Sequence, residues 1–269
     1  MRKFNLKEKA VERMKNPEAA APEEKPETER AECPVPGFSV VSRTDVGRVR
    51  RSNQDALIIG GGVAGVADGM GGHNGGEIAS GETRDGILRE LSGKTPDRQA
   101  LREAVEKINL EIWDRQEKDA SLTGMGTTLT LLWPSESEML VAQVGDSRAY
   151  RLRKESISQV SRDHSMVAEL VRDGVITPEE AQVHPYRNII TRALGAGDTV
   201  KVDILELDKQ KGDVYLICSD GLSEYVREDE MREVLLRLPM EEAADELLSR
   251  ALEGGGRDNI SLVLAEVTA

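Results

Sequence analysis

The sequence predicts an α+β fold in which two antiparallel β-sheets are covered by pairs of helices. Apolar, strand-like runs recur from Phe38 to Val267, and the helical patterns between them come in pairs. A parallel sheet built of βαβ units would instead alternate strands with single helices. Hydrophobic residues make up 38% of the chain, and although aromatic residues are few, Val, Ile and Leu can fill a core. No internal repeat is visible.

The strands follow from short runs of β-branched and apolar residues bounded by turn residues. They are expected at Phe38–Ser42, Ala56–Ile59, Val63–Ala67, Thr127–Trp133, Met139–Val144, Arg148–Leu152, Val202–Leu207, Asp213–Cys218 and Ile260–Val267. The second and third form a hairpin around three consecutive glycines at positions 60–62.

Four main helices are predicted from apolar residues at helical spacing. They are expected at about Glu77–Leu91, from Thr95 as N-cap through Ile112, near Asp229–Arg237 and at Glu241–Leu252, with Gly254 to Gly256 ending the last. A less regular insertion, Asp163–Asn188, contains one probable helix start at Thr177–Pro178.

Residues 1–36 differ in composition from residues 37–269, which we assign to a single folded domain. The first fifteen residues are basic and weakly amphipathic, and a stretch rich in Pro, Glu and Ala follows. Such a stretch cannot bury enough apolar surface to offset its ordering entropy, so a disordered linker is expected. Its role is open between a functionless tail and a short docking helix on a tether.

Charge and cysteine content exclude several classes of function. A net charge of -13 argues against nucleic acid or an anionic membrane surface as main partner. No apolar run is long enough for a membrane span and no signal peptide is visible, so we expect a cytoplasmic protein. Cys33 and Cys218 cannot form a disulfide framework, and neither is followed six positions later by the arginine of a cysteine-dependent phosphatase.

Three apolar strand-like runs end at an aspartate, namely Asp68, Asp146 and Asp220. A single Asp-Gly after an apolar run is ordinarily a turn. Repetition of the pattern indicates instead that several carboxylates gather and require cations. All the candidate ligands are oxygen donors, which suit Mg²⁺ or Mn²⁺, whereas the three histidines and two cysteines are too scattered for zinc.

Six short motifs occur in a fixed order along the folded part. They are Arg50-x-x-Asn53-Gln54-Asp55, Asp68-Gly69-Met70-Gly71-Gly72, Gly124-Met125-Gly126-Thr127-Thr128, Gly145-Asp146-Ser147-Arg148, Ser219-Asp220-Gly221 and Asp258-Asn259. No single motif is decisive, but together they resemble the PPM family, the metal-dependent protein serine/threonine phosphatases of type 2C, in its bacterial form. The resemblance covers about Phe38 to Val267.

This resemblance implies a four-layer α-β-β-α sandwich with two Mn²⁺ or Mg²⁺ ions at one end of the sheets. The implied ligands are Asp68, which would bridge both ions, Gly69 through its carbonyl, and Asp220 and Asp258, with Asp55 supporting the shared water shell; Asp146 would help to hold a third, weaker ion. The metal-bridged water, held by Asp68 and Asp220, would be the nucleophile. Two such ions about 3.5–4 Å apart can lower the pKa of a shared water enough to supply hydroxide near neutral pH.

A charge count supports this arrangement. Asp55, Asp68, Asp220 and Asp258 carry four negative charges, which two divalent ions cancel, and Arg50 would add a fixed cation for the phosphate oxygens. Simpler alternatives remain for some residues: Asp146 could cap a turn, and Arg50 could be a solvated surface charge.

Two positions depart from the family's pattern. Gln54 stands where many relatives carry Glu, and Met70 stands where eukaryotic relatives often carry a His proposed as general acid. His73, His164 and His184 are expected to be structural or exposed. The insertion falls where relatives carry a mobile flap beside the active site, and such loops commonly decide substrate choice.

The sequence thus predicts a monomeric phosphatase acting on phosphoserine and phosphothreonine in proteins and opposing a serine/threonine kinase of the same cell. A dedicated regulatory phosphatase of one partner, such as an anti-sigma-factor antagonist, is a second reading. A third is a non-catalytic phosphoprotein-binding module, although none of the expected metal aspartates is missing.

Overall fold

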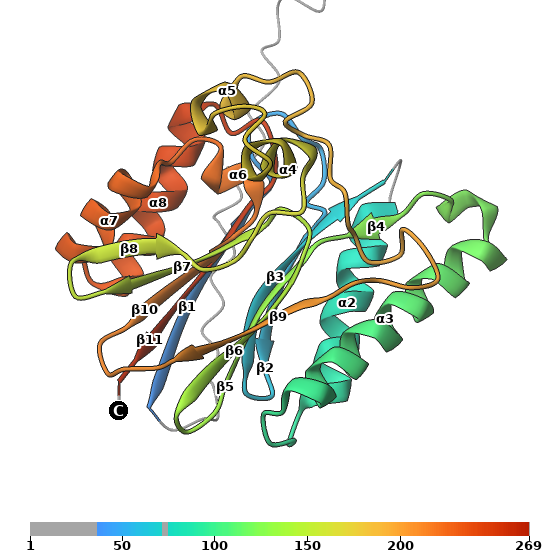
Figure 1. Ribbon diagram of the computed structural model, residues 1–269, viewed down its shortest axis with the longest axis horizontal. Coiled ribbons are helices and arrows are strands. Elements are labelled where there is room, and N and C mark those ends of the chain that lie inside the picture. Colours follow the sequence, from blue (N-terminus) through green and yellow to red (C-terminus); the bar gives the residue numbers. More distant parts are fainter. Residues whose placement is uncertain (1–36, 72–74, 269) are drawn as a thin grey trace, which may run out of the picture.

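The chain folds into four layers, with a helix pair on each outer side of two central sheets (Figure 1). The computed structural model describes residues 37–71 and 75–268. The linker predicted in residues 1–36 and the role predicted for His73 therefore concern positions outside the described residues. Within them, the α-β-β-α sandwich is confirmed.

Each sheet is antiparallel throughout its paired strands. The first has the order β1-β11-β10-β7-β8 and consists of β1 (Phe38–Asp45), β7 (Arg148–Arg153), β8 (Ser156–Gln159), β10 (Val214–Cys218) and β11 (Ile260–Val267). The second has the order β2-β3-β5-β6-β9, with β4 paired to β3, and consists of β2 (Asp55–Gly60), β3 (Val63–Met70), β4 (Gly126–Thr127), β5 (Leu129–Pro134), β6 (Glu138–Val144) and β9 (Asp203–Asp208).

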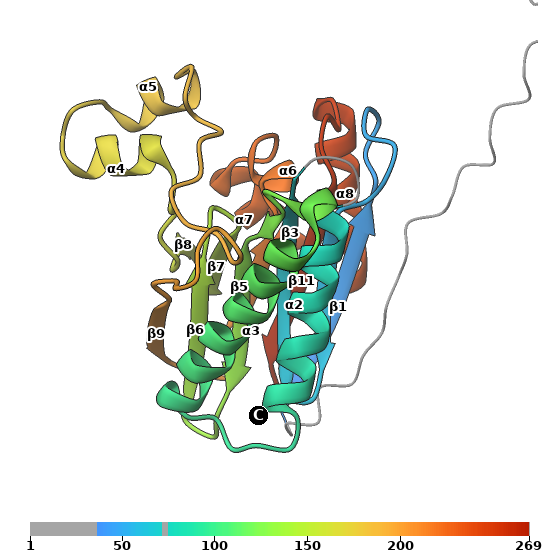
Figure 2. The ribbon, with the colours of Figure 1, turned by 90° about the vertical axis from the view of Figure 1, so that its right-hand side faces the viewer.

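The helices cover the outer faces of the two sheets, except for two short ones that stand away from the body (Figure 2). The second sheet is covered by α2 (Gly75–Leu91) and α3 (Arg98–Lys118), with the 3₁₀ turn η1 (Ala120–Leu122) after them. The first is covered by α6 (Asp220–Ser223), α7 (Glu228–Arg237) and α8 (Met240–Gly254), whereas α4 (Met166–Arg172) and α5 (Pro178–Gln182) form the projecting insertion.

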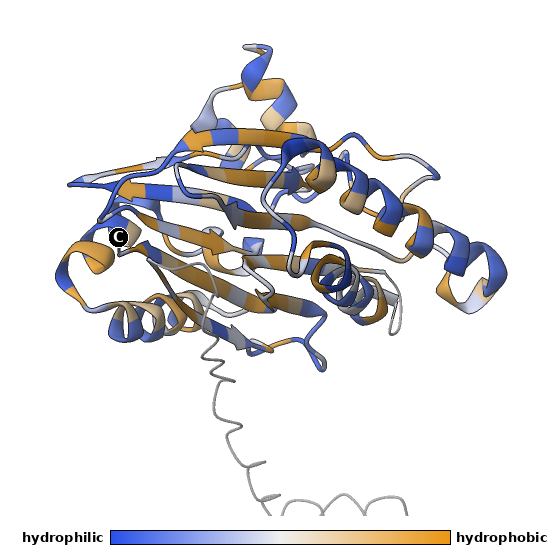
Figure 3. Ribbon diagram, turned by 90° about the horizontal axis from the view of Figure 1, so that it is seen from below, coloured by the Kyte–Doolittle hydropathy of each residue, from blue (hydrophilic) through white to orange (hydrophobic). Residues whose placement is uncertain are grey.

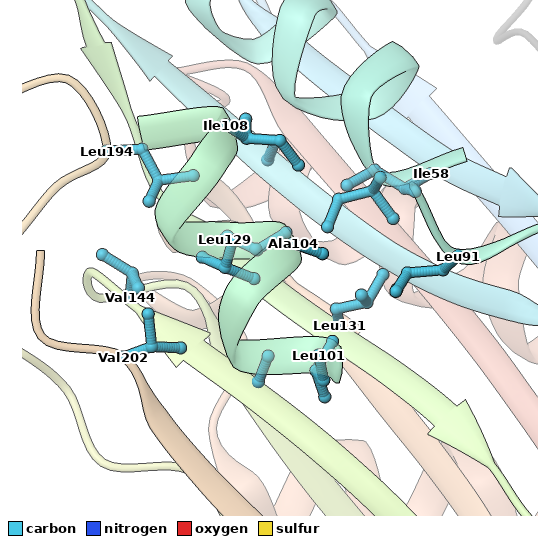
Figure 4. Close-up of a cluster of buried hydrophobic side chains, with 14 of the residues drawn as sticks. Ile58, Leu91, Leu101, Ala104, Ile108, Leu129, Leu131, Val144, Leu194 and Val202 are labelled. Atoms are coloured by element: carbon cyan, nitrogen blue, oxygen red, sulfur yellow. The ribbon is translucent and has the colours of Figure 1, made fainter. Parts of the chain in front are cut away.

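Three apolar clusters hold these layers together. One fills the space between α2, α3 and the second sheet, where Ile108 of α3 and Leu131 of β5 are buried (Figure 4). Another lies under α7 and α8, and the third lies between the sheets. Figure 3 shows hydrophobic residues along the strands of both sheets, as a core between four layers requires.

Most expected elements are present, with differences at their ends. The glycine hairpin connects β2 and β3, and Thr177 caps α5 with a reciprocal bond to Glu180. The expected N-cap Thr95 is wrong, because Asp97 accepts the bond from the Ala100 amide at the start of α3. Its carboxylate is the acceptor nearest the first free N–H groups of that helix.

Four short elements were not expected from the sequence, namely η1, β8, α4 and α6. Each is at most seven residues long, too short for hydrophobic periodicity to reveal. Among residues 37–71 and 75–268, no helix has both the length and the apolar character of a membrane span.

Candidate metal centre

The strand pairing brings the predicted aspartates to one end of the sandwich. Asp55 at the start of β2 and Asp68 near the end of β3 are register partners. In the other sheet, Cys218 at the end of β10 pairs with Arg148 at the start of β7. Asp220 lies two residues after the end of β10 and Asp146 two residues before the start of β7, so both carboxylates are placed at the same end of their sheet.

The loop before β11 contributes the remaining predicted ligand. Asp45, the last residue of β1, pairs with Ile260, the first of β11, so Asp258 lies beside the chain leaving β1. The backbone oxygen of Asp258 would lie 2.2 Å from a Cβ on Gly47, whose φ is +78°. Only glycine tolerates this contact and this backbone conformation, and it lets the two loops pass closely.

Two further glycines of the motifs allow close backbone contacts at the site. A Cβ on Gly69 would lie 2.2 Å from the backbone oxygen of Gly76, and one on Gly221 would lie 2.0 Å from that of Asn259. The glycines that follow Asp68 and Asp220 therefore allow neighbouring segments to approach both aspartates. Gly69 itself is buried in β3, and its N–H donates to the Gln54 carbonyl oxygen at 3.1 Å.

The carboxylates are close enough to raise one another's pKa. Burial raises the pKa of Asp68 well above its usual value, and the charges of Asp55, Asp220, Asp146 and Asp258 raise it further. This single set of interactions contains every predicted carboxylate ligand. The structure therefore brings all five together.

Three other members of the cluster show the same effect. Burial and then the charge of Asp146 raise the pKa of Asp220. Burial raises the pKa of Asp55 to about 6, and the charge of Asp258 adds to the shift. Burial, followed by the charge of Asp163, raises the pKa of Asp146 to about 6. The cluster is therefore short of positive charge.

One carboxylate oxygen of this cluster has no hydrogen-bond partner. Asp55 Oδ2 accepts from the Ser219 hydroxyl at 2.9 Å, whereas Asp55 Oδ1 is buried and unpartnered. A buried carboxylate oxygen without a donor is costly unless something else compensates it. A bound cation would supply that compensation.

Arg50 lies at the site, but it contacts a candidate ligand. Its Nη2 donates to Asp258 Oδ2 at 2.6 Å, and both side chains are partly exposed. A guanidinium at this position can interact with an entering phosphate as well as with the carboxylate. Arg48, the neighbouring alternative, instead donates from Nε to the Leu252 carbonyl oxygen.

Two positioning residues were not assigned roles from the sequence, although both stand inside the motifs. The buried Asn259 donates from Nδ2 to the Val46 and Ser52 carbonyl oxygens and accepts from the Gln54 amide. It therefore ties the loop carrying Arg50 to the loop carrying Asp258. The fully buried Ser219 holds Asp55 and accepts from the Ser261 amide at 3.0 Å.

The histidine expectations hold for His164, which has a structural role. It is buried, its Nδ1 accepts from the Gly145 amide at 3.1 Å, and its Nε2 lies 3.1 Å from Asp203. The Thr191 amide donates to its backbone oxygen, so the insertion begins and ends beside the turn that carries Asp146. The insertion therefore lies next to the acidic cluster.

The donor set fits hard divalent cations. It contains only oxygen ligands, and its clustered negative charge and the orphaned Asp55 Oδ1 both call for positive charge. Within residues 37–71 and 75–268, however, no three His, Cys, Asp or Glu side chains are already grouped tightly enough to hold an ion. The fit therefore rests on the shared location and charge of the carboxylates, not on a completed ligand sphere.

Comparison with known proteins identifies one family. The sequence profile of a family described as protein phosphatase 2C matches residues 48–260. The chain is 39% identical over 246 residues to the serine/threonine phosphatase stp of Listeria monocytogenes, covering 83% of this chain and 94% of that protein. It is also 39% identical to the serine/threonine protein phosphatase PstP of Mycobacterium tuberculosis, covering 84% of this chain and 44% of that protein.

Solved structures give the same result. The crystal structure of the M. tuberculosis phosphatase PstP superimposes with a TM-score of 0.82 at 37% identity, covering 86% of this chain and 99% of that one. A structure of the PstP catalytic domain in complex with two manganese ions has a TM-score of 0.80 at 36% identity, covering 86% and 99% of the two chains.

Proposed function

The chain belongs to the protein phosphatase 2C family and is a serine/threonine protein phosphatase; from this premise we propose that it hydrolyses phosphoserine and phosphothreonine with two divalent cations held at the acidic end of the sandwich. The observation that carries the proposal is the gathering of five aspartates from both sheets, with one buried carboxylate oxygen left without a donor. Buried carboxylates whose pKa values are raised by burial and by one another's charge are typical of functional sites, and here they indicate a site for cations.

Asp68, Asp220, Asp258 and the Gly69 carbonyl would hold the two ions, with Asp55 supporting them. When bound, Mn²⁺ or Mg²⁺ would supply an activated water near neutral pH and would offset the charge of the phosphate. A solved relative that contains two manganese ions supports this number and this metal. Asp146 together with Asp220 would hold a third, weaker ion.

The protein's own groups would orient the substrate. Arg50 lies at the mouth of the cluster, where its partly exposed guanidinium can leave Asp258 and hold two phosphate oxygens. Without cations, the clustered carboxylates would repel a phosphate dianion. The chain would therefore bind substrate only after its carboxylates have been neutralised.

A protein substrate is favoured by the surface of the insertion. Three large hydrophobic side chains there are exposed, namely Val175, Val183 and Tyr186, and Ile189 directly after the insertion is exposed as well. Apolar side chains on a projecting element suit contact with another protein. Since Arg187 of the insertion lies 3.8 Å from Glu224, beside Asp220, such a contact would be adjacent to the acidic cluster.

We further propose that this phosphatase is a cytoplasmic monomer that dephosphorylates a serine/threonine kinase and the targets of that kinase. A phosphatase dedicated to one partner remains the second candidate, and activity on generic phosphopeptides separates the two. Broad activity supports the kinase-opposing role, whereas activity confined to one protein supports the dedicated one.

Phosphate release from a phosphothreonine peptide tests the proposal. We expect turnover with Mn²⁺ or Mg²⁺ and none in excess chelator, with activity restored when metal is added back. The peptide with unmodified threonine, incubated with the same protein, controls for contaminating phosphate. Undiminished release by metal-stripped protein in chelator would refute the two-metal proposal.

A further inference from the structure

We propose that Thr128 is a positioning residue that sets Asp68 and the Asp146 turn in one arrangement through its buried hydroxyl. The inference rests on the proposed function, because its consequence is read out in cation binding. Thr128 is 1% exposed and lies in the short break between β4 and β5. Its hydroxyl bonds to the Asp68 amide and to the Ser147 hydroxyl, so its action is on the segments that carry the ligands.

The first observation is that a side-chain oxygen takes the place of a backbone oxygen as hydrogen-bond acceptor in the β-ladder at Asp68. The register pairs Val66 with Thr130 and Gly69 with Thr127, which places Asp68 opposite Thr128. The Thr128 amide donates to the Asp68 carbonyl oxygen at 2.9 Å, as a ladder requires. The returning bond differs, because the Asp68 amide donates to the Thr128 hydroxyl oxygen, also at 2.9 Å.

This exchange of acceptors changes how the backbone is hydrogen-bonded at the end of β3. A side-chain oxygen accepts the Asp68 N–H where a backbone carbonyl oxygen would otherwise do so, and the Thr127 hydroxyl makes a second bond to the Asp68 carbonyl oxygen. Both backbone polar groups of Asp68 are therefore held by adjacent threonines. This anchoring fixes the backbone position from which the Asp68 side chain extends.

The second observation is that the same hydroxyl reaches the turn that connects β6 of the second sheet to β7 of the first. Thr128 Oγ1 lies 2.8 Å from the hydroxyl of Ser147, which follows Asp146 and is fully buried. The Ser147 carbonyl oxygen accepts from Gln143 Nε2 at 2.7 Å and from the Thr130 hydroxyl at 3.1 Å. The turn is thus anchored to the strands of the second sheet, not only to β7.

The methyl group of Thr128 has a separate packing role at this turn. Gly145 has φ +100°, and a Cβ placed on it would lie 2.5 Å from Thr128 Cγ2. The methyl group therefore fills the space that a side chain at Gly145 would need. Packing and hydrogen bonding by Thr128 can consequently be separated by substitution.

A buried network of this kind resembles the outer groups that orient metal ligands. Removing such a group typically weakens metal affinity by about 10–100-fold while leaving the ligands themselves in place. The matched variants are Thr128→Val, which keeps the shape but loses the hydroxyl, and Thr128→Ser, which keeps the hydroxyl but loses the methyl group. Thr83→Val is the control, because Thr83 is equally buried but bonds only to the Ala79 carbonyl oxygen within α2.

The experiment is calorimetric titration of each metal-stripped variant with Mn²⁺, with peptide hydrolysis measured at low and at saturating Mn²⁺. We expect Thr128→Val to bind Mn²⁺ about 10–100-fold more weakly, with most of its activity loss recovered at saturating Mn²⁺. Thr128→Ser and Thr83→Val are expected to retain wild-type affinity. Wild-type affinity in Thr128→Val, or equal weakening in Thr83→Val, would overturn the inference.

Should circular dichroism show that Thr128→Val does not fold, Ser147→Ala tests the Thr128–Ser147 hydrogen bond from its other end, in the turn that carries Asp146. We expect it to weaken the ion held by Asp146 and to leave tight binding intact, and unchanged weak binding would overturn the inference. A wild-type protein that binds no Mn²⁺ would refute the proposed function itself. Normal Mn²⁺ binding by both wild type and variants would instead refute only the role of Thr128.

Discussion

Replacing Asp55 by Asn is expected to stabilise the metal-free protein at pH 8 while reducing its stabilisation by Mn²⁺. Burial raises the pKa of Asp55 to about 6 from an ordinary value of 3.8, so its ionised form is disfavoured in the folded state. The shift is about 2 pKa units, or about 3 kcal/mol at 1.36 kcal/mol per unit. Because solvent reaches part of the residue, we expect a gain of about 1–3 kcal/mol in unfolding free energy.

The pH dependence gives the sign of this effect. A carboxylate with a raised folded pKa contributes stability that is fully present below its unfolded pKa of 3.8 and is lost as the pH rises through about 6. At pH 5, about 1 unit below the folded value, protonation of Asp55 contributes about 1.4 kcal/mol that is absent at pH 8. The advantage of Asp55→Asn in chelator should therefore shrink as the pH falls from 8 to 5.

Urea denaturation in excess chelator at both pH values, for wild type and variant, measures this difference. The unfolding free energy of the variant is compared with that of wild type at each pH because His164 also titrates in this range. Burial lowers the pKa of His164, so its protonation destabilises the folded state as the pH falls through its unfolded value near 6.5. His164 is common to both proteins and cancels. A variant less stable than wild type at pH 8 in chelator would refute the reasoning that burial disfavours the ionised form of Asp55 in the metal-free folded protein.

Substitutions at three further positions test separate parts of the account. Asp68→Asn should lower kcat on a phosphopeptide by at least about 10³, comparable with loss of a principal electrostatic stabiliser, and retention of a tenth of wild-type kcat would reject it as a ligand. Arg50→Ala should lower kcat/KM by about 10–10³, and Arg50→Lys should lower it by less, since a lysine keeps the charge without the bidentate geometry. Steady-state kinetics measure this, with Arg51→Ala as control. A wild-type kcat/KM in Arg50→Ala would contradict the prediction. Cys218→Ser should cost about 1–3 kcal/mol in thermal or urea unfolding but leave turnover per folded molecule unchanged, because Cys218 is a fully buried core residue; inactive, well-folded protein would reopen a nucleophilic role.

The Arg50–Asp258 ion pair changes one expectation about metal affinity. From the sequence, Arg50→Ala should hardly alter metal binding. In the structure its guanidinium bonds a candidate ligand at 2.6 Å, so the variant frees that carboxylate. Partly exposed ion pairs contribute at most about 1 kcal/mol, which limits the gain in Mn²⁺ affinity to about fivefold.

The layers and the position of the acidic cluster could be predicted because both depend on strand patterns. Apolar runs ending in Asp68 and Asp220 specify both the core strands and the carboxylates at their ends. The glycine hairpin could likewise be predicted, since Gly61 and Gly62, which connect the paired Gly60 and Val63, can adopt the positive φ values that such a turn needs.

Contacts between distant segments could not be predicted in the same way. Asn259 spans more than 200 positions to reach Val46 and Ser52, and no local pattern encodes its three bonds. The hydrogen bond from the Asp68 amide to the Thr128 hydroxyl depends on side-chain geometry between two strands. The Asp97 cap replaced the expected Thr95 because both residues are plausible caps and only their position relative to the first helical turn decides between them.

Counting Mn²⁺ ions bound to the purified chain tests most directly whether the acidic cluster is a metal centre. Calorimetric titration of metal-stripped wild type should show two tightly bound ions per chain and a weaker third, with the tight sites disrupted in Asp68→Asn and only the weak site lost in Asp146→Asn. Thr83→Val serves as the folded control and should match wild type. Equal Mn²⁺ binding by wild type and Asp68→Asn would contradict the account, because the shared carboxylate would then hold no metal.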